Sequence, residues 1–131
     1  MNYAEKNSDG DRTRKSYLLL RRLFVSVGDI RSKCKVEIDE IFLVLCLIFV
    51  ADADALVKSE SRRLGGASAH TISQMTDIPR ETVRRKLQRM INLGAVIQDP
   101  GKLYHLNRSD PLIVAVLQAI GRMTDDIDQD G

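Results

Sequence analysis

Hydrophobic residues recur at helical spacing over much of the chain. Residues 16–27 place leucine, phenylalanine and valine three or four positions apart, which predicts an amphipathic helix. Residues 36–57 are apolar around most of a helical circumference, so we expect a longer helix packed between other elements. Residues 112–123 are apolar on nearly every side and follow Ser-Asp-Pro at 109–111, which supplies an N-cap and a first-turn proline. The pattern predicts a mainly helical protein.

Both ends of the chain lack this periodicity. Residues 1–15 are polar and punctuated by Gly and Asp, so we expect a flexible tail there. Residues 125–131 are strongly acidic, and we expect a second tail. Within the chain, Gly65 and Gly66 predict the end of whatever element precedes them.

Two short helices separated by a tight turn are predicted between Ser68 and Gly94. Ser68 fits the N-cap of the first helix, and Pro79 fits the start of the second. The apolar residues of the second helix fall on a single stripe, and Gly94 ends it. Such a pair is a helix-turn-helix, whose second helix enters the major groove of DNA and reads bases with its N-terminal residues.

A β-hairpin is predicted directly after these helices. Residues 95–98 and 103–106 are short β-prone runs, joined by Asp99-Pro100-Gly101-Lys102, which has turn residues at its centre. A hairpin in this place is the wing of a winged helix, and Lys102 at its tip is placed to meet a phosphate or an edge of the minor groove. The expected fold is therefore mainly α: a winged helix-turn-helix with a small β-hairpin wing and flanking N- and C-terminal helices.

These elements predict the domain organisation. A dimerisation helix and linker occupy residues 16–35, the winged helix-turn-helix occupies 36–108, and a second dimerisation helix occupies 109–124. Both terminal helices are too apolar for one small domain to cover, so we expect a homodimer that presents its recognition helices to half-sites about 34–36 Å apart.

Charge is distributed unevenly along the 131 residues. The chain has a net charge of only +2, yet residues 58–108 contain ten Lys or Arg and four Asp or Glu, a net of +6. Clustered basic residues attract polyanions, and the outer face of helix 79–93 is where they gather. The candidate DNA-binding residues are Arg80, Glu81, Thr82, Arg84, Arg85, Gln88, Arg89 and Lys102.

Residues 78–87, Ile-Pro-Arg-Glu-Thr-Val-Arg-Arg-Lys-Leu, resemble the recognition helix of the cyclic-AMP receptor protein family, whose pattern is Arg-Glu-Thr-Val-x-Arg-x-Leu. The resemblance implies base contacts for Arg80, Glu81 and Arg85, and a phosphate contact for Thr82. Arginine can bond guanine O6 and N7, and glutamate can accept from cytosine N4. Nothing here looks like that family's cyclic-nucleotide domain or long dimer helix. The layout is more similar to small dimeric repressors of the MarR type.

Two function classes stay open. The first is a sequence-specific transcriptional regulator that binds double-stranded DNA; the second is a winged helix that docks a protein partner through its apolar ends and uses its basic face for solubility. Salt dependence separates them, because binding through several phosphates weakens steeply with salt. A small-molecule effector between the dimer helices and the winged helix is also possible, and no residue pattern names one.

Other classes are disfavoured. The chain has no Gly-rich phosphate loop, no HExxH, no Cys-x-x-Cys and no nucleophile elbow, so we expect no enzyme, cofactor or metal site. The longest apolar run, residues 41–51, is too short to cross a bilayer. Two cysteines, Cys34 and Cys46, make no disulfide framework, which favours a reducing, cytoplasmic location.

Overall fold

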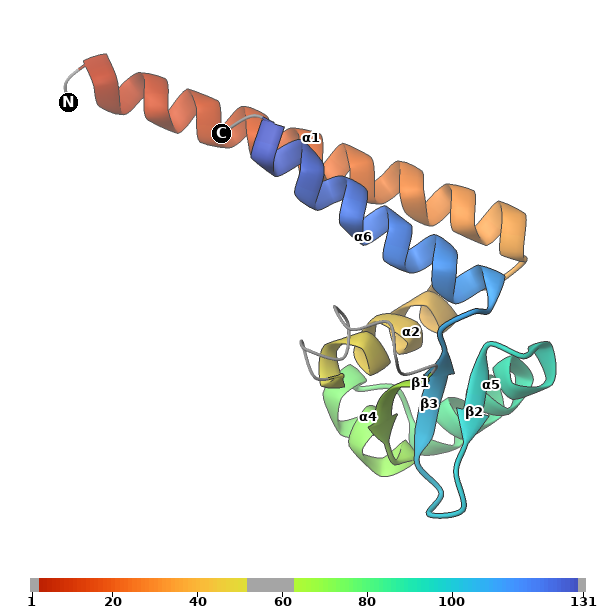
Figure 1. The fold of residues 1–131 in the computed structure, drawn as a ribbon. Helices are drawn as coiled ribbons and strands as arrows, with labels where there is room; N and C mark the ends of the chain where they lie inside the picture. The colour runs from red at the N-terminus through yellow and green to blue at the C-terminus, as the bar shows by residue number, and fades with distance from the viewer. Residues whose placement is uncertain (1–2, 52–62, 130–131) are drawn as a thin grey trace.

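The computed structural model describes residues 3–51 and 63–129 and is mainly helical (Figure 1). Two long helices, α1 (Tyr3–Cys34) and α6 (Pro111–Gln129), lie side by side and run in opposite directions. We call this pair the arm. It projects away from the remaining elements, which we call the body.

The body combines three helices with a small sheet. Along the chain it contains α2 (Ile38–Val50), β1 (Arg63–Ala67), α4 (Ala69–Thr76), α5 (Arg80–Leu93), β2 (Val96–Gln98) and β3 (Tyr104–Asn107). The sheet is antiparallel in the order β1-β3-β2, with Leu64 opposite Leu106 and Val96 opposite the same residue on the other side. Its β2–β3 connection projects away from the arm (Figure 1).

The core lies where α2 meets the sheet and the helix pair. Helix α2 packs against β1, β3, α4 and α5. Apolar side chains from each element meet there and are fully buried, and they exclude water from the centre of the body. They include Leu43, Leu47, Leu64, Ile72, Leu87 and Leu106.

Local sequence signals position α4 and α5 as predicted. The Ser68 hydroxyl accepts a hydrogen bond from the Thr71 amide at 3.2 Å and caps α4. Helix α5 begins directly after Pro79, and Gly94 ends it with a φ of +90°. The Ser73 hydroxyl donates to the Ile78 carbonyl at 2.7 Å, which holds the turn between the two helices. The predicted caps and hairpin are therefore confirmed.

The predicted flexible tail at residues 1–15 is wrong for residues 3–15, which form the first part of α1. These residues show no apolar period because, as Figure 1 shows, much of this part of α1 extends beyond α6. Helical geometry still brings Arg14 within 3.8 Å of Asp11, a pair that helix formation places on one face. At the other end, α6 continues to Gln129, so the acidic tail expected at 125–131 is also wrong for residues 125–129.

Two further boundaries differ from expectation. Gly65 and Gly66 lie inside β1, with φ of +96° and +123°, and do not end an element. The sheet therefore has a third strand, which was not predicted because glycines usually end an element. Helix α2 ends at Val50; the expected extension over residues 52–57 lies outside the described residues. In the described parts of the chain, no helix is long and apolar enough to cross a bilayer.

Candidate nucleic-acid interface

Helix α5 separates buried from exposed residues by helical period. Val83, Leu87 and Met90 are fully buried in the body. On the opposite side lie Arg84, Arg85 and Gln88, together with Arg80 and Glu81 at the first turn, and all five side chains are exposed. We call these five residues the basic face of α5. Five of the eight residues proposed from the sequence to bind DNA are therefore brought together on one open surface.

The arginines of the basic face are weakly engaged. Among the described residues, the side chains of Arg80 and Arg85 have no hydrogen-bond or ion-pair partner. Arg84 lies 3.5 Å from Glu81, and both side chains are exposed to water, where such pairs add little stability. The guanidinium groups on this face remain accessible to an external acceptor.

Thr82 and Lys102 lie outside the basic face. Thr82 is half-buried on the flank of α5. Lys102 is exposed in the β2–β3 connection, where it adopts a φ of +65° and its amide donates to the Asp99 carbonyl at 2.9 Å. The turn therefore presents Lys102 to solvent from a hydrogen-bonded loop.

Asp99 is the residue that organises this turn. Its carboxylate accepts from the Leu103 amide at 2.9 Å and lies 2.8 Å from Nε2 of His105 on β3. The His105 hydrogen bond, followed by that from Leu103, lowers the pKa of Asp99 below its usual value. No role was predicted for His105 from the sequence. Its contact with Asp99 could have been anticipated, because the two residues are six positions apart across the predicted hairpin.

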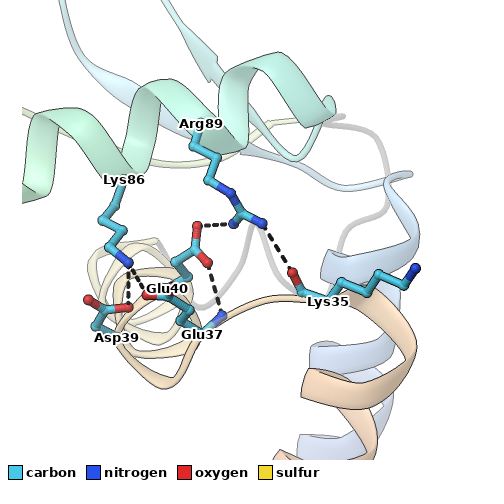
Figure 2. A network of polar contacts seen from close by, with 6 residues as sticks. All are labelled: Lys35, Glu37, Asp39, Glu40, Lys86 and Arg89. Atoms are coloured by element: carbon cyan, nitrogen blue, oxygen red, sulfur yellow. Dashed lines mark hydrogen bonds and ion pairs between the residues drawn. The ribbon is translucent and has the colours of Figure 1, made fainter.

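Arg89 does not belong with the basic face (Figure 2). Its guanidinium donates to the Glu40 carboxylate and, at 3.1 Å, to the Lys35 carbonyl. Glu40 is fully buried, and its other oxygen accepts from the Glu37 amide at 2.9 Å. The expectation that Arg89 contacts DNA stays a prediction; its side chain is turned towards the start of α2, where a buried carboxylate holds it.

Lys86 shares this flank of α5 and is also held by carboxylates (Figure 2). Its ammonium donates to Glu37 and lies 3.4 Å from Asp39 Oδ1, and only 13% of its side chain is exposed. The Lys86 hydrogen bond lowers the pKa of Glu37, and Glu37 in turn raises the pKa of Lys86. We call Lys86 and Arg89 with Glu37, Asp39 and Glu40 the α2–α5 clamp.

One signal for the clamp was present in the sequence. Glu37 is the N-cap of α2 and Glu40 is its third residue, so each side chain bonds the backbone amide of the other position. This reciprocal arrangement is a capping box, and the glutamate at the third helical residue is the part of it that matches the usual sequence pattern. The partners on α5 are 49 residues away and no local pattern indicates them.

A groove of about 560 Å³ lies between the two helices of the arm, at the end next to the body. Its charged lining residues are Arg22, Asp29, Lys33 and Arg122. The volume is within the range of small-molecule sites, which is roughly 300–1,000 Å³. The lining mixes both signs of charge with Ser26, Cys34 and alanines, so it selects no ligand class, and an effector stays a prediction.

Comparison of the chain with protein-family models, with curated proteins and with solved structures found no match.

Proposed function

We propose that the body is a winged helix-turn-helix and that the chain is a sequence-specific transcriptional regulator that binds double-stranded DNA. The observation that carries the proposal is the basic face of α5, which exposes three arginines on the second helix of a helix-turn-helix pair. The order helix–strand–helix–helix–strand–strand, with a lysine-tipped hairpin beside α5, supports it. A helix of this kind fits the major groove.

The proposal gives a role in DNA binding to each residue of the basic face and to Thr82 and Lys102. Arg80 and Arg85 bond guanine edges through their forked guanidinium groups, and Glu81 accepts from cytosine. Arg84 and Gln88 extend the reading surface along α5. Thr82 and Lys102 contact phosphates, which position the protein but carry no sequence information. Arg89 has no contact with DNA in this proposal.

The proposal includes a symmetric homodimer formed through the arm. On α1, Tyr17, Leu20 and Phe24 are spaced three and four residues apart, and they are 61%, 55% and 76% exposed. This spacing is that of a helix–helix seam, and a second copy of the same stripe covers it in a two-fold arrangement. The dimer then presents two α5 helices to half-sites about 34–36 Å apart. We place this regulator in the cytoplasm, the reducing location that its two free cysteines favour.

Fluorescence anisotropy of a labelled random duplex at several salt concentrations tests DNA binding. We expect affinity to fall steeply with added salt, because released counterions drive the interaction. Arg85→Ala should bind more weakly than the parent. Arg12→Ala removes the same charge from an exposed position on α1 and should match the parent.

Absence of binding at low salt would overturn the proposal and favour the alternative of a protein-docking winged helix. Equal effects of Arg85→Ala and Arg12→Ala would also contradict it, because they would indicate general attraction to positive charge and no dedicated face.

Sedimentation velocity tests the dimer. Phe24→Glu should shift the protein from dimer to monomer, since it places a charge in the apolar seam. Phe49→Glu is the matched control, because Phe49 lies on α2 and is 78% exposed, nearly the same as Phe24. A dimer that survives Phe24→Glu, or a parent protein that sediments as a monomer, would contradict this assembly.

A further inference from the structure

Two short connectors join the arm to the body. Residues 35–37 lead from α1 into α2, and residues 108–110 lead from β3 into α6. The first connector is bonded to the C-terminal half of α5, and Asn107, which adjoins the second, is bonded to the two residues that directly follow α5. The N-terminal half of the same helix carries most of the basic face.

Arg89 bonds the first connector. Its Nη2 donates to the carbonyl of Lys35, which adopts a left-handed φ of +54° between α1 and α2. Its Nη1 donates to buried Glu40, whose second oxygen accepts from the Glu37 amide (Figure 2). A single guanidinium therefore links α5 to the end of α1 and to the start of α2. Its planar fork fixes direction as well as distance.

Asn107 bonds the second connector to the end of α5. Its side-chain amide donates to the Gly94 carbonyl at 2.9 Å, and its backbone amide donates to the Ala95 carbonyl at 2.8 Å. Its own carbonyl accepts from the Asp110 amide at 3.1 Å, and α6 begins at the next residue. One connector is thus tied to the last turns of α5 through Arg89, and the other to the two residues that directly follow α5.

We propose that Arg89 is a positioning residue that sets the angle between α5 and the arm, and through it the half-site spacing that the dimer accepts. This inference rests on the proposed function. In a two-fold dimer the arms fix one end of the geometry, so the separation of the two basic faces follows from how α5 is held against its own arm. Arg89 supplies that hold without touching a base, so half-site sequence and half-site spacing depend on different arginines of the same helix.

Selection from a pool of randomised duplexes tests this separation. The parent, Arg89→Gln and Arg85→Gln are each put through the same selection, and the enriched half-site and the spacer length are read by sequencing. For Arg89→Gln we expect the parent's half-site with a broader spacer distribution, the preference for the dominant spacer falling on the order of tenfold. For Arg85→Gln we expect an altered half-site with the parent's spacer.

The outcomes separate the two proposals. A parent that enriches no sequence would overturn the proposed function and this inference with it. Enrichment by the parent together with an unchanged spacer distribution for Arg89→Gln would overturn the inference alone. A changed half-site for Arg89→Gln would also overturn it, because Arg89 would then read bases.

A second variant guards against simple unfolding. Arg89→Gln leaves the buried Glu40 carboxylate without its cation, so the double variant Glu40→Gln with Arg89→Gln is selected in parallel. Glutamine at position 40 retains the acceptor for the Glu37 amide, which keeps the capping box. The double variant should show the same broadened spacers, and a return to the parent's spacer distribution would contradict the proposed hold.

Discussion

The two sides of α5 carry the same residue types in opposite circumstances. Arg80, Arg84 and Arg85 lie on the basic face, with at most an exposed i,i+3 partner. Lys86 and Arg89 lie on the flank towards α2, and three carboxylates of that helix's first turn and N-cap hold them. A cation on the first side is available to a ligand, whereas a cation on the second side is already part of the fold.

This contrast shows that the role of a basic side chain on a helix depends on whether it is exposed to water or paired with a carboxylate of the same chain. An exposed cation keeps its hydration and its rotamer freedom until a phosphate or a base replaces the water. A cation opposite a buried carboxylate prevents an uncompensated charge in the interior, so its removal is costly. Replacing an arginine on the flank towards α2 should therefore lower mainly stability, whereas replacing one on the basic face should weaken mainly DNA binding.

The largest expected difference is in stability. Arg89→Ala should lower the free energy of unfolding by about 2–3 kcal/mol, somewhat below the range for fully buried pairs because 46% of the Arg89 side chain is exposed. Arg85→Ala should change it by less than about 0.5 kcal/mol, as exposed positions usually do. Urea unfolding followed by circular dichroism measures both. Equal losses in the two variants would remove the distinction between the sides.

The reverse order is expected for DNA binding. Arg85→Ala should weaken binding to the selected site by about 1–3 kcal/mol and relax the base preference, because a forked contact with guanine is lost. Lys102→Ala should weaken all sequences alike and reduce the salt slope by about 1. Anisotropy titrations of cognate and random duplexes at several salt concentrations provide the comparison. A uniform loss across sequences for Arg85→Ala would show that it contacts only phosphate.

A smaller effect is expected in the pH dependence of stability. Lys86 lowers the pKa of Glu37, so this carboxylate stabilises the fold at pH values above the ordinary glutamate value of 4.5. That contribution is lost as the pH falls below 4.5 and through the lower pKa of the folded state. Glu37→Gln should therefore flatten the fall in stability on the acid side.

Urea unfolding at a series of pH values measures this effect. Lys86→Gln should reduce the fall in stability at acid pH in the same way. The double variant should show nearly the same pH dependence as either single variant. If the fall in stability at acid pH were unchanged by Lys86→Gln, the lowered pKa of Glu37 could not be assigned to its pair with Lys86.

The smallest effect concerns Glu81 and Arg84 on the basic face. Their separation of 3.5 Å makes an exposed i,i+3 ion pair. A double-mutant cycle with alanine should give a coupling in stability of no more than about 0.5 kcal/mol. A larger value, similar to that of a clamp pair, would mean that the basic face is locked before any ligand arrives.

Structural features that are set by neighbouring residues could be predicted from the sequence, whereas contacts between residues far apart in the chain could not. Ser68, Gly94 and the turn at residues 99–102 act through their own neighbours, and each predicted cap or turn is present. Strand β1 was missed because glycines usually interrupt elements, while its pairing with β3 involves residues about 40 positions away. Arg89 was assigned to DNA for the same reason, since Glu40 lies on another helix.

The glycines of β1 have a consequence for how this chain can change over time. A methyl group at position 65 would lie 3.0 Å from the Leu47 carbonyl oxygen, and one at position 66 would lie 3.1 Å from the His105 ring. Both positions also have φ values that side chains disfavour. At Gly10, Gly28 and Gly121 an added methyl group would meet nothing within 4 Å. Substitution of these arm glycines therefore meets no steric barrier within the chain, whereas the α2 backbone restricts position 65 and the His105 ring on β3 restricts position 66.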